Sequence, residues 1–328
     1  MSGLLRRDRI HTDAREAIEL SPLATRSVDT RGRDIAEELD VWRTPFEWDR
    51  DRILHSKAFR RLKHKTQVFM NPDGDHFVTR LTHTLQVTQI GRALARYLGL
   101  NEPLTEAICL GHDVGHSPFG HTGEEALTPY VDGEWHHAAQ SVRILELLEP
   151  VNLTWEVRDG IRAHSWKVDP PPDTAEGYCC RFADRIAYLT HDVDDALRAG
   201  VITFDDLPGS AITTFGPAGP GWIESMIEAV VDESARQGTV MMDSGSLESM
   251  NQLRDFMFER VYLRPEAEDQ RSRAITIIRD LVDHYIAHPD RIPPTYQQDN
   301  AGAVTQAIDY VSGMTDRFAI REWDALTD

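Results

Sequence analysis

The hydrophobic positions of this chain recur with the period of an α-helix. Leu81, Leu85, Ile90 and Leu94 follow one another at intervals of about four residues, which places them on one face of a helix. The same spacing is found over 142–148, 186–193, 222–230, 250–261 and 275–285. There is no internal repeat and no convincing parallel-strand pattern. The sequence therefore predicts an all-α protein.

Local signals indicate where two of these helices begin. Thr44-Pro45 combines a residue that caps helix N-termini with a proline suited to the first helical position. It predicts a helix that runs through the basic segment that follows. Three consecutive prolines at 170–172 interrupt the chain before the helix that contains Asp184.

The amino-acid composition of the chain changes after residue 200. Residues 201–221 contain several glycines and prolines and are expected to form a loop or linker. Helical spacing then resumes. We therefore expect a chemistry-bearing core with an N-terminal arm over 1–200, and a helical C-terminal region over 201–328 that packs on it.

The composition is that of a globular protein, with 41% hydrophobic and 27% charged residues. No apolar stretch approaches the roughly 20 residues that span a membrane, and the N-terminus lacks the apolar core of a secretory signal. The three cysteines are too few and too poorly spaced for a disulfide framework or a zinc knuckle. These features predict a cytoplasmic protein with no membrane partner.

The net charge of −19 is unevenly distributed along the chain. Residues 1–100 contain 18 Lys and Arg against 14 Asp and Glu, whereas residues 101–328 contain 17 against 40. The acidic total argues against general coating of nucleic acid. The basic excess is concentrated between Arg50 and Lys65, where seven cationic residues accompany one aspartate. This segment is either a solvated helical face or a local anion site.

The densest group of chemically active side chains lies between positions 112 and 121. His112, Asp113, His116 and His121 bring three imidazoles and a carboxylate into ten residues. Neutral imidazole and carboxylate suit a divalent first-row metal. Glycines and a proline between them indicate an irregular backbone, which excludes the continuous helix that a zinc-protease motif requires.

Two further residues fit poorly in the apolar helices that contain them. His83 is next in phase to Leu81 and Leu85, and by itself it would be interpreted as a core histidine. Asp184 places a charge on an otherwise buried helix, which is costly unless the charge is paired or bound to a metal. Together with His112 and Asp113, they form a set of metal-ligand type.

The order His, His-Asp, Asp resembles the defining ligand set of the HD superfamily of phosphohydrolases. The surrounding sequence is similar to one branch, the bacterial dGTPase-like deoxynucleoside triphosphate (dNTP) triphosphohydrolases. The similar stretches lie within about residues 25–200, at 51–62, 65–68, 80–83, 112–121, 123–125 and 183–192. The resemblance implies an orthogonal helical bundle of the HD type with a helical C-terminal extension.

The resemblance also implies a reaction and a cofactor. One divalent metal would bind His83, His112, Asp113 and Asp184 and polarise the α-phosphate. Attack of water at the α-phosphorus would yield a deoxynucleoside and inorganic triphosphate. Mn²⁺ and Mg²⁺ are the first expectations for the metal, with Fe²⁺ and Zn²⁺ as alternatives.

Further roles follow from the resemblance, residue by residue. His121 and His137 match catalytic histidines near the scissile phosphate, and Glu124 would orient His121. The expected phosphate-binding residues are Arg80, His116 and Arg185. Many relatives have Asp where this chain has Arg185, and Asn where it has Ala138, which bears on the choice between His136 and His137. We prefer His137.

Recognition of the sugar would depend on four residues. Gln67 and Asp192 can bond a 3′-hydroxyl, and Tyr188 and Val68 would exclude a ribose by crowding C2′. Tyr188 and Asp192 lie one and two helical turns after Asp184, so the three share a helix face. A core aromatic remains the alternative for Tyr188.

Other functions are open at this point. A second enzymatic possibility is another HD nucleotide phosphohydrolase, such as a 5′-nucleotidase. A third is a nucleotide sensor or single-stranded DNA-binding protein with little turnover, which the Arg50–Lys65 segment suggests. The resemblance further implies a homo-oligomer, with a nucleotide or single-stranded DNA as a possible effector.

Overall fold

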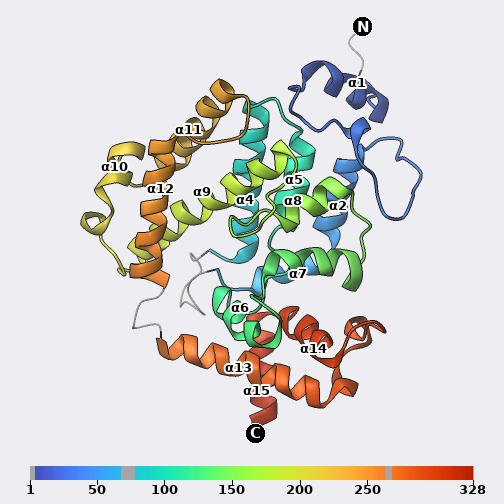
Figure 1. The fold of residues 1–328 in the computed structure, drawn as a ribbon, viewed down its shortest axis with the longest axis vertical. Coiled ribbons are helices and arrows are strands. Elements are labelled where there is room, and N and C mark those ends of the chain that lie inside the picture. The colour runs from blue at the N-terminus through green and yellow to red at the C-terminus, as the bar shows by residue number, and fades with distance from the viewer. Residues whose placement is uncertain (1–3, 68–77, 263–267, 328) are drawn as a thin grey trace.

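The computed structural model describes residues 4–67, 78–262 and 268–327. Within these ranges the chain forms fifteen α-helices and no β-strand (Figure 1). Extended backbone pairs only at isolated bridges, from Arg33 to Thr154 and from Thr66 to Thr79. The prediction of an all-α fold is confirmed. No helix in the described ranges combines the length and apolar character needed to cross a membrane.

Nine helices precede the Gly- and Pro-rich segment, and six lie within or after it. The first nine are α1 Arg9–Glu19, α2 Pro45–His55, α3 Lys57–Arg61, α4 Arg80–Tyr97, α5 Glu102–Gly111, α6 His121–Leu127, α7 His137–Arg143, α8 Trp155–Arg162 and α9 Ala175–Arg198. The others are α10 Gly209–Phe215, α11 Gly221–Gln237, α12 Ser244–Met257, α13 Glu268–Ala287, α14 Ala303–Ser312 and α15 Asp316–Thr327. Single π-helical turns extend α7 over Ile144–Leu148 and α12 over Phe258–Tyr262. Short 3-10 helices span Ser27–Asp29, Leu62–His64, Thr128–Tyr130, Phe204–Asp206, Pro289–Arg291 and Pro294–Tyr296.

The predicted helix start at Thr44-Pro45 is confirmed, but the helix is shorter than expected. Thr44 Oγ1 accepts a hydrogen bond from the Glu47 amide, and the Glu47 carboxylate accepts one from the Thr44 amide, a complete capping box. Helix α2 ends at His55 because Ser56 has an extended backbone and caps the next helix, α3. Two helices and a 3-10 turn therefore cover the basic segment.

The prediction of a loop over 201–221 is wrong for its middle part, which forms α10. Ala211 and Phe215 are one helical turn apart and both are buried in the core. The glycines and prolines that suggested a loop lie at the ends of this helix, with Pro208 before it and Gly216 after it. Burial of one apolar face is what stabilises so short a helix.

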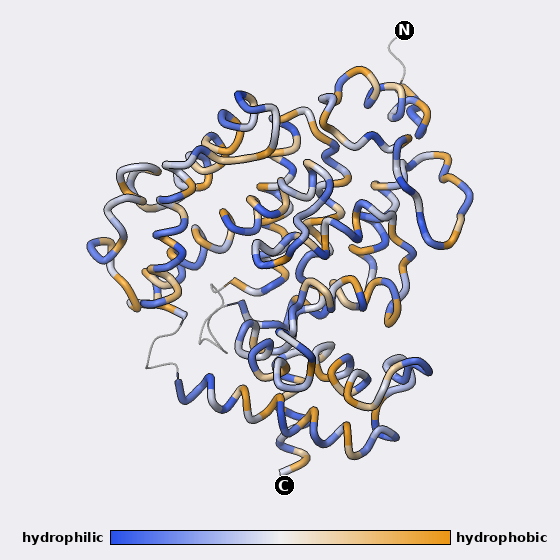
Figure 2. The backbone as a smooth tube through the Cα atoms, viewed as in Figure 1, coloured by the Kyte–Doolittle hydropathy of each residue, from blue (hydrophilic) through white to orange (hydrophobic). Residues whose placement is uncertain are grey.

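The buried apolar side chains form two clusters. The first lies among α2, α4, α5, α8 and α9 and extends over α10–α12. The second lies among α13–α15 and includes Phe119, Ala126, Leu127 and Trp135 from the segment around α6. Figure 1 shows α6 between the larger assembly and α13–α15, and Figure 2 shows hydrophobic and hydrophilic positions mixed along the helices. The histidine-rich segment thus lies where the two clusters meet.

Candidate metal centre

Three packed helices bring the predicted metal ligands together. Helix α4 packs against α5 and α9, and α5 packs against α9. Gly91 allows this close approach, because a Cβ there would lie 2.7 Å from Cys109 Sγ and 3.5 Å from Ala183 Cβ. His83 lies in the first turn of α4, His112 follows the last residue of α5, and Asp184 lies in the middle of α9.

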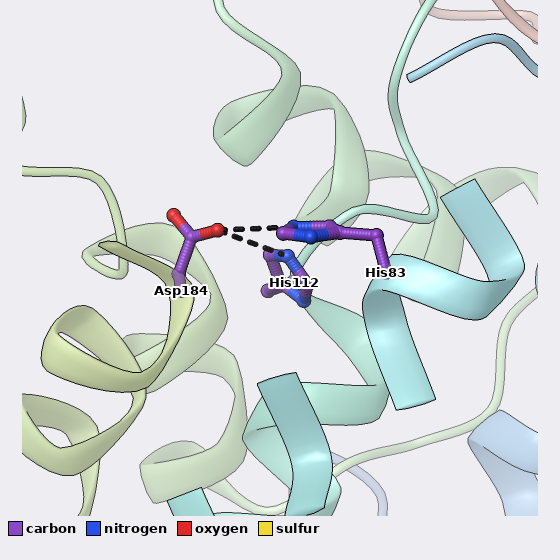
Figure 3. A group of neighbouring side chains, drawn as sticks. All are labelled: His83, His112 and Asp184. Atoms are coloured by element: carbon purple, nitrogen blue, oxygen red, sulfur yellow. Dashed lines mark hydrogen bonds and ion pairs between the residues drawn. The ribbon is translucent and has the colours of Figure 1, made fainter. Parts of the chain in front are cut away.

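The side chains of His83, His112 and Asp184 converge on one point (Figure 3). Asp184 Oδ1 lies 3.1 Å from His83 Nε2 and 3.8 Å from His112 Nε2. Asp113 lies beside this group, with its Oδ1 3.5 Å from His112 Nε2, but its ligand atoms cluster with those of His116 and His137. The side chains of His83, His112 and Asp113 are buried, and that of Asp184 is partly exposed.

The hydrogen bonds of His112 show that this arrangement fits a divalent metal. Nδ1 of His112 lies 2.7 Å from the carbonyl oxygen of Cys109, which can only accept, so Nδ1 carries the proton. Nε2 therefore presents a lone pair, and it makes no hydrogen bond within the described chain although it is buried. A ring nitrogen oriented in this way by a carbonyl is the usual state of a metal-ligating histidine.

Both carboxylates of the set are held in the ionised form that a metal requires. Burial opposes ionisation of Asp184, but the hydrogen bond from His83 and the nearby His112 outweigh it and lower the pKa of Asp184 to about 2. Burial is likewise outweighed at Asp113, whose pKa is held well below its usual value by His112 and Arg80. The carboxylates of Asp184 and Asp113 are therefore both anionic at neutral pH.

The irregular segment after His112 is fixed against α7. The Gly115 amide donates to Ser141 Oγ at 2.9 Å, and Ser141 Oγ donates to the carbonyl of His112 at 2.8 Å. A Cβ at Gly115 would lie 2.2 Å from the Ser141 amide nitrogen, so only glycine fits there. This contact sets α7, and with it His137, against the metal-ligand set.

One predicted catalytic histidine, His137, stacks on His116, which was predicted to bind phosphate. The rings of His116 and His137 are 4.2 Å apart and nearly parallel, and His137 Nε2 lies 3.6 Å from Asp113 Oδ1. Burial lowers the pKa of His137 to about 4. His121 begins α6, is exposed, and lies edge-on to His116 at 5.6 Å.

Glu124 bonds a different histidine from the one expected. Its Oε1 accepts from the His137 amide at 3.0 Å and lies 2.6 Å from His137 Nδ1, and no hydrogen bond joins it to His121 in the described structure. His136 instead caps α7, accepting from the Ala138 amide. The structure thus places His137, not His136, against Asp113.

The three predicted phosphate-binding residues retain polar atoms without partners. Arg80 Nη1 donates to Asp113 Oδ2 at 2.8 Å, but its Nε and Nη2 are buried and make no hydrogen bond to any described residue. The same holds for His116 Nδ1 and Arg185 Nε. The Arg185 guanidinium also lies over the Trp166 ring, 4.6 Å from its centroid. Such donors are available to an anionic ligand.

The predicted sugar-binding residues differ in their burial and in their hydrogen-bond partners. Gln67 Oε1 is buried and has no partner among the residues described. Tyr188 lies one turn after Asp184 on α9 and is half-buried. Asp192 is buried and accepts a hydrogen bond from Tyr262 at 2.7 Å, and burial raises its pKa to about 7. Val68 lies outside the described residues.

Sequence reasoning missed His164, which is in direct contact with the site. His164 is buried just after α8, with Nε2 3.0 Å from His137 Nε2 and its ring edge-on to His112 at 5.0 Å. Its Nδ1 lies 2.7 Å from the carbonyl of Ile161. The only signal in the sequence was a single histidine near the end of an amphipathic helix, which does not distinguish a site residue from a core residue.

Part of the basic segment is neutralised within the fold. Arg50 pairs with Asp51 and Glu106, Arg52 with Glu37, and Arg61 with Glu149. Lys65 is fully buried and donates to two carbonyl oxygens. Lys57, Arg60 and Lys63 are exposed and pair with no carboxylate among the described residues, so part of the positive charge counted in the sequence is presented to solvent.

Comparison with protein families and curated proteins gives a consistent result. Residues 80–189 match the HD domain, and residues 240–325 match the phosphohydrolase-associated domain. A deoxyguanosinetriphosphate triphosphohydrolase-like protein of Caldanaerobacter subterraneus subsp. tengcongensis is 45% identical over 310 residues, which is 93% of this chain and 91% of that protein. Proteins of the same description from Clostridium perfringens and Desulfatibacillum aliphaticivorans are 40% and 41% identical, and the alignments cover 95% and 96% of both chains, respectively. This chain is an HD-domain phosphohydrolase and belongs to the deoxyguanosinetriphosphate triphosphohydrolase-like family.

Proposed function

We propose that the protein hydrolyses deoxynucleoside triphosphates to a deoxynucleoside and inorganic triphosphate, by attack of water at the α-phosphorus. The observation that carries the proposal is a metal-ligand set with unpartnered phosphate donors beside it. His112 Nε2, His116 Nδ1 and Arg80 Nη2 are all buried without hydrogen bonds to the described chain. The family relatives, named for activity on deoxyguanosine triphosphate, supply the substrate class.

His83, His112, Asp113 and Asp184 would hold the divalent metal. When bound, the metal supplies a Lewis acid that polarises the phosphate and lowers the pKa of a coordinated water. Nitrogen and carboxylate donors without cysteine accommodate Mn²⁺, Mg²⁺, Fe²⁺ or Zn²⁺, with Mn²⁺ and Mg²⁺ as our first expectations.

Proton transfer falls to His137 and His121. As the bond from α-phosphorus to the 5′-oxygen breaks, the leaving oxygen needs a proton. Burial favours the neutral form of His137, and the negative charge of a bound triphosphate would raise the pKa of His137. Glu124 fixes the His137 ring through Nδ1, which leaves Nε2 as the atom that exchanges a proton.

Arg80, His116 and Arg185 would hold the triphosphate oxygens. Arg80 is already bonded to Asp113, so its guanidinium is fixed in direction while two of its nitrogens stay available. Arg185 stacks on Trp166 and is oriented in the same way. Preorganised donors of this kind stabilise charge that develops in the transition state.

Gln67, Val68, Tyr188 and Asp192 would recognise the deoxyribose. The unpartnered Gln67 Oε1 can accept a hydrogen bond from a 3′-hydroxyl. Asp192, with its raised pKa, can donate or accept at the same group. A site that bonds a hydroxyl in this way strongly rejects an analogue that lacks it.

Product identification tests the proposal. Purified protein is mixed with each of the four dNTPs and Mn²⁺, and the phosphate products are separated. Inorganic triphosphate with a deoxynucleoside is the expected result. Release of orthophosphate or pyrophosphate would contradict it and favour another HD nucleotide phosphohydrolase. The variant His137→Asn should lose activity, whereas His288→Asn, an exposed histidine outside the site, should retain it.

A homo-oligomer is part of the proposal. Several large apolar side chains of the N-terminal arm are exposed, among them Leu4, Leu5, Ile10 and Ile18. Where exposed apolar side chains form a continuous patch, they are common at subunit contacts. Sedimentation should show a species larger than the 37.2 kDa chain, with nucleotide or single-stranded DNA tested as effectors. A fully active monomer would contradict it.

A further inference from the structure

One carboxylate from the C-terminal helices joins the two segments that bear the proposed sugar and catalytic residues. Asp316, the first residue of α15, is buried. Its Oδ2 accepts hydrogen bonds from the Thr66 amide at 3.0 Å and from the Thr66 hydroxyl, and its Oδ1 accepts from the Phe119 amide at 3.1 Å. Thr66 precedes Gln67, and Phe119 lies two residues before His121.

A second, independent link joins the same three parts of the chain. Lys65 is completely buried, and its ammonium group donates to the carbonyl oxygens of His116 and Ser312. Ser312 is the last residue of α14, and His116 belongs to the histidine-rich segment. Lys65-Thr66 is therefore bonded on one side to the C-terminal helices and on the other to the segment between His112 and His121.

The backbone around Phe119 depends on these contacts. Phe119 has φ +61°, a left-handed conformation that is costly for a bulky residue. Its amide is held by Asp316, and its ring packs in the apolar cluster of α13–α15. The next residue, Gly120, lies directly against the sugar side of the site, where a Cβ would be 3.4 Å from the Gln67 carbonyl oxygen.

We propose that Asp316 is a positioning residue that sets Gln67 relative to His121, and that α13–α15 thereby determine recognition of the substrate 3′-hydroxyl. This inference rests on the proposed function, because Gln67 is taken to bond that hydroxyl. It gives the C-terminal helices a role in specificity, although Asp316 need not touch the substrate.

The substitution Asp316→Asn tests the geometry with little change in volume. The carboxylate accepts on both oxygens at once, whereas an amide has one accepting oxygen and one donating nitrogen. One of the two amides, Thr66 or Phe119, then faces a donor and loses its partner. The two segments should separate slightly, and small misplacements of reacting groups reduce rates strongly.

The readout is the ratio of kcat/KM for a dNTP that the enzyme hydrolyses to that for its 2′,3′-dideoxy analogue. We expect Asp316→Asn to lower this ratio about tenfold, in line with the loss of one hydrogen bond to substrate. Gln67→Ala should lower it similarly. The double variant should lower it no further, because both changes remove the same interaction.

Asp309→Asn is the matched control. Asp309 is equally buried and joins α14 to α7 through Arg143 and Gln140, without contact to Thr66 or Phe119. It should leave the ratio unchanged. An equal fall in Asp309→Asn, or additive effects in the double variant, would overturn the inference.

Amide hydrogen exchange separates this inference from the proposed function, since it requires no turnover. Asp316→Asn should speed exchange over 64–67 and 116–121, whereas Asp309→Asn, which weakens the link between α14 and α7, should speed exchange in α14 but not in those two segments. Unchanged exchange in Asp316→Asn overturns the inference whatever the activity. If wild-type protein hydrolyses no dNTP, the proposed function fails and the assignment to 3′-hydroxyl recognition falls with it, while faster exchange would still confirm the link itself.

Discussion

At the scale of single residues, several of the buried polar atoms without partners lie close together in the candidate site. His112 Nε2, His116 Nδ1, Gln67 Oε1 and two nitrogens of Arg80 are all unpartnered within the described chain. Each such atom costs about 1–3 kcal/mol when it is left unsatisfied in a folded protein. Their concentration beside Asp113 is understandable if a metal and a polyanion complete their bonding.

Replacing His112 with alanine should remove the metal. The side chain offers a lone pair held in direction by the Cys109 carbonyl, so no neighbouring atom can substitute for it. Metal content, measured by mass spectrometry of the purified protein, should fall from about one ion per chain to about a tenth or less. His288→Ala should retain the wild-type content. Equal metal content in both variants would show that His112 is not a ligand.

Asp192 should make stability fall as the pH rises. Its pKa is raised to about 7 by burial, against 3.8 for the ordinary group. Between pH 5.5 and 7 the unfolded chain is already ionised at this position while the folded chain keeps its proton. Wild-type protein should therefore lose about 2 kcal/mol relative to Asp192→Asn over this interval, and the difference should level off above pH 7. Parallel denaturation curves for the two proteins would mean that Asp192 is ionised in the fold.

Site residues that are neighbours in the sequence, or that interrupt an apolar helix face, could be predicted from the sequence. A site residue without such a local signal could not. His112-Asp113 is conspicuous because two ligand types are neighbours, and His83 and Asp184 because they interrupt apolar faces. The structure brings three of them within reach of one ion, although their role as ligands stays a prediction. His164 has no such local mark, because its contact with His137 is created by packing between segments 27 residues apart.

At the scale of elements, the position of α7 decides whether His137 reaches the metal-ligand set. Gly115→Ala should displace it, because the new Cβ would meet the Ser141 amide nitrogen, which cannot move independently of the helix. We expect a loss of about 1–3 kcal/mol in the free energy of unfolding, and a larger proportional loss of activity than of stability. Urea denaturation and steady-state kinetics would measure the two.

Gly221→Ala is the control for that change. Gly221 begins α11, has an ordinary backbone conformation, and has open space where a Cβ would lie. Its substitution should leave stability within about 0.5 kcal/mol and activity unaltered. If Gly115→Ala behaved like Gly221→Ala, the close contact between the histidine-rich segment and α7 would be disproved.

The helices themselves were predictable where one face is regularly apolar or where a cap is explicit. Thr44 indicated the start of α2, which it caps with a capping box. The end of α2 at Ser56 and the existence of α10 were not predicted. Each depends on which side chains the tertiary structure buries, and the local sequence does not show this. Ser56 can cap or continue a helix, and Phe215 is helical only because the core covers it.

At the scale of the whole molecule, polar links join the two apolar clusters. The HD-domain match and the phosphohydrolase-associated match fall on opposite sides of these links. Asp309 of α14 bonds Gln140 and Arg143 of α7, and Asp316 bonds Thr66 and Phe119. The catalytic segment is therefore held from both sides, which no local pattern in the sequence could indicate.

The link between Asp309 and Arg143 should carry much of the attachment of the C-terminal helices. Asp309 is buried, and Arg143 reaches it through Nε and Nη2, each at 2.7 Å. Arg143→Ala leaves that carboxylate buried with only Gln140, which should cost about 3 kcal/mol or more in the free energy of unfolding. Exchange of amides in α14 should become faster before the rest of the molecule unfolds.

By contrast, Lys167→Ala removes an exposed pair with Glu134 and should cost under about 1 kcal/mol in the free energy of unfolding. Equal effects of the two substitutions would mean that apolar packing alone holds the C-terminal helices in place.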